Sequence, residues 1–342
     1  MSKGKILITG ASGFVGSFLV EEALQQDYEV WAAIRPTSSR KYLQDNRIHI
    51  LEIHLNDRKK LYSELSVVKE QIGLWNYVFH VAGVTKAKDK TLFMKTNYEA
   101  TKVLVETLCS LNMIPQKFVM MSSLSVLGNI KEEKLKCLKS HVYPELTSID
   151  IPKPNTIYGK SKLRAEEYLL NSNLPIVILR PTGVYGPREK DYMMMVDCIK
   201  KHFDFAVGYK CQEITFIYVK DLAKVALKAV ERGVVGKTYL LSDGNTYKSS
   251  DFSKLIQKEL GIKIVFRFII PLFVVKWICY LSQIITSLTG KVNALNIDKY
   301  NILKQRNWRC NIDDAINDLG YEPKYNLERG VKETILWYKN NL

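Results

Sequence analysis

The stretch KILITGASGFVG, residues 5–16, decides the fold. Lys5–Thr9 is a short apolar run that predicts a β-strand, and Gly13–Gln25 has the periodicity of a helix. Three glycines at a spacing of three permit a tight turn, a close approach of backbone to phosphate, and close packing of the helix on the strand. N–H groups at the start of such a helix bind anions. We therefore predict a dinucleotide-binding loop, and its residues are Gly10, Ser12, Gly13, Phe14, Val15 and Gly16.

Apolar runs and helix-period segments continue to alternate through the first half of the chain. The further expected strands are 29–34, 47–53, 76–80, 117–121 and 175–179, and the further expected helices are 93–111 and 159–171. This alternation predicts an α/β fold, a Rossmann-type doubly wound parallel sheet with a smaller, mainly helical C-terminal substrate lobe. We assign residues 1–180 to an NAD(P)-binding domain, with a strand returning near 237–242. Residues 181–236 and 243–342 form the expected substrate-binding lobe.

The composition is that of a globular chain with a surplus of basic residues. The 342 residues are 46% hydrophobic, and 50 Lys and Arg against 35 acidic residues give a formal charge of +15. The basic residues are scattered, so we expect no nucleic-acid partner. The six cysteines form no Cys-x-x-Cys pair and no zinc-spaced cluster with histidine, which predicts free thiols and no metal site. The N-terminus shows no secretory signal, so we expect a cytoplasmic location.

The residue after the second expected strand indicates which dinucleotide binds. An NAD site usually has a carboxylate here, which accepts a hydrogen bond from the ribose 2′-hydroxyl. This chain has Arg35, followed by Ser38, Ser39 and Arg40. Arginine pairs with a 2′-phosphate, so the sequence favours NADP(H) over NAD(H), unless Arg35 is simply a solvated surface residue.

Tyr158 and Lys162 form a candidate acid/base pair. Their spacing of four places both side chains on one face of the helix that begins near residue 159. A free tyrosine has a pKa near 10, and a neighbouring ammonium lowers that pKa towards the working range. Ser122 and Ser123 follow the strand 117–121, at the edge where open α/β sheets bind ligands. No histidine or acidic residue completes a nucleophile elbow, so a hydrolase triad is not expected.

A series of motifs spans nearly the whole chain and resembles one known superfamily. It is the extended short-chain dehydrogenase/reductase superfamily, of the NAD-dependent epimerase/dehydratase type. The motifs are Thr9–Gly16, His80–Gly83, Thr96–Thr101, Ser122-Ser123, Tyr158–Lys162, Leu179–Arg188, Phe216–Asp221 and Leu319–Pro323.

This resemblance implies a role for each candidate site residue. Tyr158 is the expected acid/base, and Lys162 is expected to bind the nicotinamide ribose while tuning Tyr158. Ser123 would polarise the reacting oxygen, and Asn97 would support Lys162, often through water. The residues expected to line the cofactor are Ala82, Gly83, Pro181 and Val184.

Two reactions remain open within the superfamily. Nucleotide-sugar epimerases and dehydratases often have an asparagine after the sixth-strand arginine, where this chain has Arg180-Pro-Thr-Gly183. They also often have a diphosphate-binding arginine where this chain has Ile214 and Thr215. The chain is more similar to dihydroflavonol-4-reductase-like and 3β-hydroxysteroid-dehydrogenase-like members. We therefore favour an oxidoreductase acting on a small, partly apolar substrate. The alternatives are a nucleotide-diphosphate-sugar epimerase or dehydratase, and a non-catalytic NADP sensor.

The segment 266–288 is unusually apolar, and three interpretations compete for it. It could cap the substrate cleft, lie on a membrane surface, or span a membrane weakly. Lys276 within it argues against a full span. We predict a helix that caps the cleft near Tyr185 and Tyr192, with Phe273 and Trp277 facing the substrate. Peripheral membrane contact is the secondary interpretation, which the basic charge favours.

A homodimer is the expected assembly. In the superfamily, the helices before Leu111 and after Tyr158 often pair across a two-fold axis, and both segments have apolar faces here.

Overall fold

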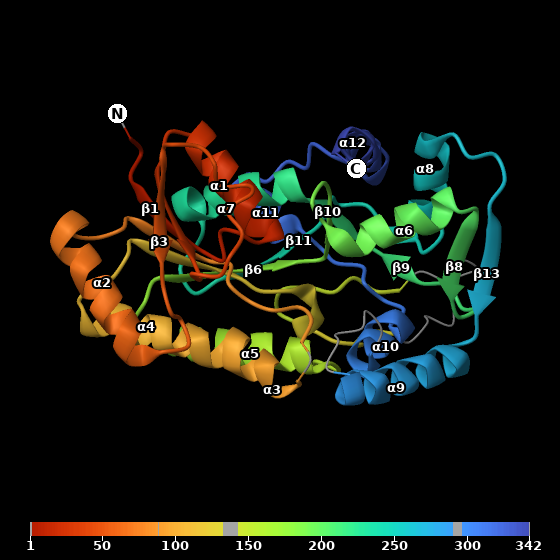
Figure 1. The fold of residues 1–342 in the computed structure, drawn as a ribbon, viewed down its shortest axis with the longest axis horizontal. Helices are drawn as coiled ribbons and strands as arrows, with labels where there is room; N and C mark the ends of the chain where they lie inside the picture. The colour runs from red at the N-terminus through yellow and green to blue at the C-terminus, as the bar shows by residue number, and fades with distance from the viewer. Residues whose placement is uncertain (1, 88, 133–142, 290–295, 342) are drawn as a thin grey trace.

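A seven-stranded parallel sheet forms the centre of the molecule (Figure 1). The computed structural model describes residues 2–87, 89–132, 143–289 and 296–341. The strands of this sheet are β1 Lys5–Thr9, β2 Glu29–Ile34, β3 Ile48–Glu52, β4 Tyr77–His80, β5 Lys117–Met121, β6 Ile176–Pro181 and β11 Thr238–Leu241. Their order is β11-β6-β5-β4-β1-β2-β3, and every neighbouring pair is parallel. This confirms the doubly wound Rossmann-type fold, in which the crevice beside β1 binds ligands.

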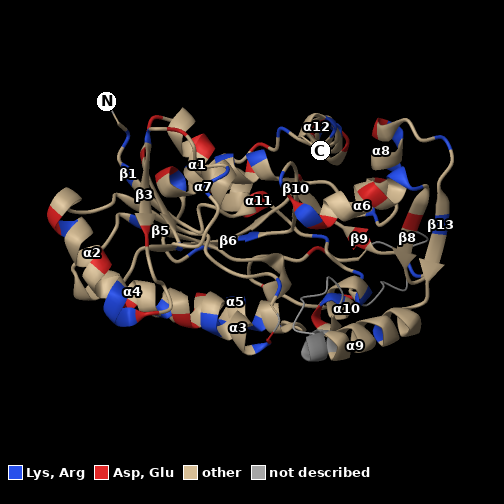
Figure 2. Cartoon of the chain, in the orientation of Figure 1, with Lys and Arg blue, Asp and Glu red and all other residues tan. Residues whose placement is uncertain are grey.

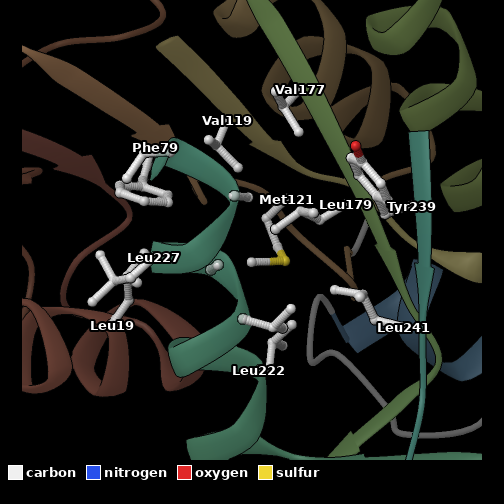
Figure 3. Packing of buried hydrophobic residues seen from close by; sticks show 14 of the residues in the cluster. Leu19, Phe79, Val119, Met121, Val177, Leu179, Leu222, Leu227, Tyr239 and Leu241 are labelled. Carbon is white, nitrogen blue, oxygen red and sulfur yellow. The ribbon is translucent and has the colours of Figure 1, made fainter. Parts of the chain in front are cut away.

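Helices cover both faces of the sheet, which is why its central strands are apolar. One face carries α1 Phe14–Gln25, α7 Val219–Arg232 and α11 Asp313–Leu319. The opposite face carries α2 Arg58–Ile72, α4 Ala100–Ser110 and α5 Ile157–Leu170. All six residues of β6 are buried as a result. In Figure 3, Leu19 of α1 and Leu227 of α7 pack near Phe79 of β4.

The expected helix over 93–111 contains a wide turn that sequence periodicity missed. The structure has α3 Thr91–Met94, then a π-helical turn, η1 Lys95–Glu99, and then α4. The apolar spacing that predicted the helix lies in α4, and its buried residues include Leu104 and Leu108. A π turn contains an additional residue and is found frequently at functional sites.

The C-terminal lobe has its own aromatic core. Tyr185 makes ring contacts with Tyr192, Phe216, Tyr218 and Phe252 at centroid distances of 5.4–6.4 Å. The lobe is mainly helical, but it also contains three two-stranded sheets. Its elements are β7 Gly183–Tyr185, α6 Lys190–Lys200, β8 Phe203–Val207, β9 Glu213–Ile214, β10 Phe216–Tyr218, β12 Tyr247–Lys248, α8 Asp251–Leu260, β13 Phe266–Ile270, α9 Leu272–Thr289, α10 Ile297–Lys304 and α12 Leu327–Asn341.

The predicted helix over 266–288 is wrong in its first part. Phe266–Ile270 is the strand β13, which pairs in parallel with β8. Helix α9 begins only at Leu272. Pro271 separates the two elements, because proline disfavours the helical conformation in the residue before it.

The predicted place of the cap beside Tyr185 and Tyr192 is also wrong. Tyr185 and Tyr192 pack inside the aromatic core of the lobe, against Phe216 and Phe252. Phe273 and Trp277 of α9 are 67% and 65% exposed, so they do not pack into that core. The sequence could not decide this, because apolar side chains surround α9 on most of its circumference. In the part of the chain described here, no helix has the length and hydropathy needed to cross a membrane.

Candidate active site

The glycine-rich turn after β1 has the geometry of a dinucleotide cradle. Gly10 adopts φ +69°, and a Cβ there would lie 2.7 Å from the Ala82 nitrogen. A Cβ on Gly16 would lie 2.2 Å from the Gly10 carbonyl oxygen, so only glycine fits. Gly13 is the N-cap of α1, and among the residues that the structure describes no side chain caps that helix. The first-turn N–H groups, which belong to Phe14, Val15 and Gly16, can therefore bind a phosphate.

Open space above the turn supports the same assignment. Among the described residues, a Cβ on Gly13 would contact only the Gly10 oxygen, at 3.1 Å. Ser12 lies between these glycines and is partly buried. Ala82 and Gly83 follow β4 at the adjacent strand end. The described residues therefore fit a dinucleotide, whose pyrophosphate would lie over Gly13.

At the end of β2, one cationic side chain has no ion-pair partner among the described residues. Arg35 directly follows β2 and is exposed, and it makes no ion pair within the described ranges. The nearby Arg40 instead pairs with Glu52 at 2.6 Å. Arg35 is thus the cation at this strand end that remains available to a ligand.

Tyr158 and Ser123 meet at the ends of α5 and β5. Tyr158 lies in the first turn of α5, whose N-cap Thr156 accepts a hydrogen bond from the Gly159 N–H at 2.9 Å. Ser123 follows β5 and caps a short 3₁₀ turn. Burial raises the pKa of Tyr158, while a hydrogen bond between the Ser123 and Tyr158 hydroxyls lowers it. The two hydroxyls can therefore hold one substrate oxygen between them.

Lys162 lies one helical turn after Tyr158, and its side chain is buried. Burial lowers the pKa of Lys162 to about 8, and the Glu166 carboxylate raises it against that effect. Tyr158, Lys162 and Glu166 follow each other at intervals of four residues on one face of α5. Glu166 therefore helps to keep the Lys162 ammonium charged near neutral pH.

Glu166 is held by a buried network that sequence reasoning missed. Arg180, on β6, donates to its carboxylate from Nε at 3.1 and 3.2 Å and from Nη2 at 2.6 Å. The Ser122 hydroxyl donates to the same carboxylate. The Glu166 and Arg180 side chains are 1% and 6% exposed. A buried pair of this kind fixes the position of α5 relative to the sheet.

Asn97 forms hydrogen bonds both with the loop after β4 and with helix α5. Its Oδ1 accepts from the Val84 N–H at 2.8 Å, and its Nδ2 donates to the Val84 oxygen and the Ser161 hydroxyl, at 3.1 and 2.9 Å. A Cβ on Gly83 would lie 3.0 Å from Asn97 Oδ1 and 3.7 Å from Lys162 Nζ. Asn97 thus lies beside Lys162, and its direct partners are Val84 and Ser161.

His80 closes the network on the sheet side. Its two ring nitrogens hydrogen-bond the hydroxyls of Thr9 and Thr101, each at 2.8 Å. Complete burial, and the neighbouring charge of Lys162, lower the pKa of His80 to about 3. His80 is therefore neutral and links β1, β4 and α4 beneath Asn97, without a role as a proton donor.

Helix α10 reaches the start of α5 from the C-terminal lobe. The Asp298 carboxylate accepts hydrogen bonds from the N–H groups of Ile157 and Tyr158, at 2.9 and 3.3 Å. A carboxylate at this place satisfies unpaired N–H groups and complements the helix dipole. The spacing of 140 residues gave no sequence signal for this contact.

Pro181 and Val184 complete the set of predicted residues. Pro181 ends β6 and is buried beside Leu241 of β11. Val184 lies in β7, where it pairs with Ile217 of β10. Both lie at the carboxyl end of β6, which is the parallel neighbour of the strand that Ser123 follows, β5. The structure therefore brings the candidate catalytic residues and the glycine-rich turn to one edge of the sheet, with Arg35 at the end of β2.

Comparison with known proteins gives matches over nearly the whole chain. The family described as the NAD dependent epimerase/dehydratase family matches residues 6–242. The sterol-4-alpha-carboxylate 3-dehydrogenase (decarboxylating) of Dictyostelium discoideum is 23% identical over 96% of this chain and 99% of that protein. A 4-hydroxy-2-methyl-3-oxo-4-farnesyl-3,4-dihydroquinoline-1-oxide ketoreductase of Stigmatella aurantiaca is 24% identical over 96% of this chain and 94% of that protein. The solved UDP-glucose 4-epimerase of Thermotoga maritima has a TM-score of 0.75 at 22% identity, over 98% and 99% of the two chains.

Proposed function

Because the chain belongs to the NAD dependent epimerase/dehydratase family, we propose that it is a nicotinamide-dependent oxidoreductase. It reduces a carbonyl, or oxidises a hydroxyl, on a small and partly apolar substrate. The observation that carries this proposal is the pairing of the Tyr158 and Ser123 hydroxyls one helical turn from the buried Lys162. The names of the sterol dehydrogenase and the farnesyl-quinoline ketoreductase support the substrate class.

The residues divide the chemistry of a carbonyl reduction among them. The bound nicotinamide supplies the hydride. The Tyr158 hydroxyl donates a proton to the carbonyl oxygen, and the Ser123 hydroxyl orients that oxygen with a second hydrogen bond. The Lys162 ammonium stabilises the phenolate that proton transfer leaves on Tyr158. Glu166 raises the pKa of Lys162, so the ammonium persists at neutral pH.

The alternative reaction is that of a nucleotide-diphosphate-sugar epimerase or dehydratase. The likeness in fold to a UDP-glucose 4-epimerase favours it. The residues near β9 and β10 argue against it, because Thr215 is buried and its hydroxyl donates to the Trp308 oxygen at 2.6 Å. Its neighbour Ile214 has no charge, so neither residue can bind a diphosphate. For this reason we place the oxidoreductase first.

Net consumption of cofactor separates these reactions. We expect the protein to oxidise NADPH stoichiometrically with apolar ketones, and to leave UDP-glucose unchanged. An epimerase would interconvert the sugar without net change in the cofactor. Turnover of UDP-sugars without turnover of any ketone or alcohol would overturn the proposal. Cofactor binding without any turnover would instead favour the sensor.

The cofactor we propose is NADP(H) rather than NAD(H). The exposed Arg35 at the end of β2 supports this choice, because a guanidinium forms charge-assisted hydrogen bonds with a 2′-phosphate. The carboxylates near this loop are already paired, Glu52 with Arg40 and Asp45 with Arg47.

We also propose a cytoplasmic homodimer. The cysteines described in the structure are free, which suits a reducing compartment, while Cys137 lies outside the described residues. The apolar faces of α4 and α5 pack on the sheet, so they cannot form the dimer contact themselves. On the outer surface, the rings of Tyr98 and Tyr168 are partly exposed, and their centroids lie 6.2 Å apart. Together they offer an apolar surface to a partner.

A further inference from the structure

The ribbon formed by β8 and β13 has its phenylalanines on one face and a charged pair on the other. The parallel register pairs Phe203 with Phe266 and Phe205 with Phe268. Side chains alternate along each strand, so these four rings share one face. On the other face, Asp204 pairs with Arg267 at 3.7 Å and accepts a hydrogen bond from Ser253 of α8 at 3.0 Å. The ribbon therefore offers its aromatic face to the surroundings of the protein.

Three of the four rings form one exposed cluster, because the ring centroids of Phe203, Phe205 and Phe268 lie 6.0–6.3 Å apart. Phe266 lies opposite Phe203 in the strand register, and all four side chains are 41–58% exposed. Ile264, which precedes β13, is also exposed. Soluble proteins rarely expose contiguous apolar surface of this kind without a binding role.

Helix α9 extends the apolar surface directly from the ribbon. Its inner side is narrow, because only Val275 and Cys279 are buried among its described side chains. Its outer side carries four exposed apolar side chains, at 54–67% exposure. These are Phe273, Trp277, Tyr280 and Leu281. The ribbon and α9 lie at the same end of the molecule (Figure 1).

Basic residues accompany the part of this apolar surface formed by β13 and α9, and the sequence of that part contains no acidic residue. Residues 260–297 include Lys263, Arg267, Lys276 and Lys291 and contain no aspartate or glutamate. Lys263 and Lys276 are exposed. In the cartoon of Figure 2, α9 is coloured blue at a basic position, and neither β13 nor α9 is coloured red for an acidic one. Exposed aromatic rings beside lysines match the boundary between headgroups and acyl chains of an anionic bilayer.

We propose that the β8–β13 ribbon and α9 form a docking surface for an anionic lipid bilayer. The aromatic side chains enter the headgroup boundary, and Lys263 and Lys276 approach the lipid phosphates. The protein lies on the bilayer and does not cross it, consistent with the hydropathy of the described helices. This docking is independent of which reaction the active site performs.

Helix α10 connects the docking surface to the active site. Helix α9 packs along α10, and the buried Cys279 contacts α10 at Tyr300. The same α10 carries Asp298, which binds the N–H groups of Ile157 and Tyr158. A protein docked through α9 therefore has its catalytic tyrosine one helix away from the docking surface.

Sedimentation with vesicles tests the proposal on the full-length protein. We expect binding to phosphatidylcholine vesicles that contain phosphatidylglycerol, and much weaker binding to phosphatidylcholine alone. The double variant Phe268→Ser, Trp277→Ser should lose at least about a hundredfold in partition coefficient, because two aromatic side chains no longer leave water. Lys263→Gln and Lys276→Gln should each lose about fivefold, and high salt should weaken binding.

Matched control variants separate docking through this surface from non-specific adsorption to vesicles. Leu336→Ser on α12 removes an exposed apolar side chain, and Lys59→Gln on α2 removes an exposed lysine. Both should bind vesicles like the wild type, and all variants should keep the wild-type urea midpoint. The proposal is overturned if the wild type stays in the supernatant with anionic vesicles, or if the controls lose as much binding as the test variants. It is also overturned if light scattering shows an oligomer that Phe268→Ser, Trp277→Ser dissociates, since the surface would then bind a second copy.

Discussion

Replacing Glu166 by glutamine tests whether one buried carboxylate supports both the fold and the catalytic lysine. Glu166 and Arg180 are 1% and 6% exposed and are joined by contacts of 2.6, 3.1 and 3.2 Å. Removing one charge of a buried pair leaves the other without a counter-charge, which costs about 3–5 kcal/mol. The glutamine oxygen still accepts a hydrogen bond, so we expect a loss of about 3 kcal/mol in the free energy of unfolding.

Urea unfolding measures this loss. With a denaturant slope of about 3 kcal/mol/M, the midpoint should fall by about 1 M. Glu167→Gln is the matched control, because Glu167 is half-exposed and pairs with Arg164 only at 3.5 Å. This surface pair should be worth below about 0.5 kcal/mol. A loss in Glu166→Gln below about 1 kcal/mol would refute the reasoning that this pair stabilises the fold.

The pH profile of the same variant provides the second readout. The folded pKa of Lys162 is lowered to about 8, so its charged form, and with it carbonyl reduction, declines as pH rises through about 8. Below that pH, the buried charge of Lys162 lowers the free energy of unfolding. This loss disappears as the pH rises from about 8 to the pKa of lysine in the unfolded chain, near 10.4. Without the Glu166 carboxylate, the pKa of Lys162 falls further, so the decline of kcat/KM should move to lower pH. An unmoved profile would show that Glu166 does not act on Lys162.

Tyr158→Phe removes the proton donor, so turnover should fall at least about a hundredfold while calorimetry shows nearly unchanged NADP(H) binding. Wild-type turnover in this variant would exclude Tyr158 as the acid/base. Calorimetry on the wild type should show tighter binding of NADP(H) than of NAD(H) by about 1–3 kcal/mol, and Arg35→Ala should remove the difference. Equal affinities in the wild type would contradict the role of Arg35. Light scattering at micromolar concentration should show a homodimer, and a monomer alone would count against the contact through Tyr98 and Tyr168.

Local spacing in the sequence predicted the parts of the site that depend on neighbouring residues. The glycine-rich turn after β1 could be predicted because all its determinants lie within residues 5–16. These are the tight turn, the glycine that lets backbone approach a phosphate, and the start of the helix. The spacing of Tyr158 and Lys162 placed them on one helical face, as α5 shows. The alternation of apolar strands with helical segments predicted the parallel sheet. Its central strands could be recognised because both of their faces are buried, so that nearly all of their residues are apolar.

Contacts made only by the tertiary fold escaped prediction. Glu166 meets Arg180 across the boundary between α5 and β6, and Asp298 reaches Tyr158 from another lobe. No periodicity in the sequence marks such pairs. The prediction of a helix over 266–288 failed for a different reason, because an apolar run of five residues fits a strand as well as a helix. Pro271 was the signal that could have divided it into β13 and α9.

The wide turn η1 sets the requirements of stability and of function against each other. Regular α-helix has better hydrogen-bond geometry than a π turn, so shortening Lys95–Glu99 by one residue would favour the helix itself. The same change would rotate Asn97 by about 100° relative to α4 and remove it from Val84 and Ser161. Directed evolution for thermal tolerance alone should therefore accept deletions here that a screen for turnover rejects. A Thr96 deletion that preserves turnover would show that the length of this turn is not under functional constraint.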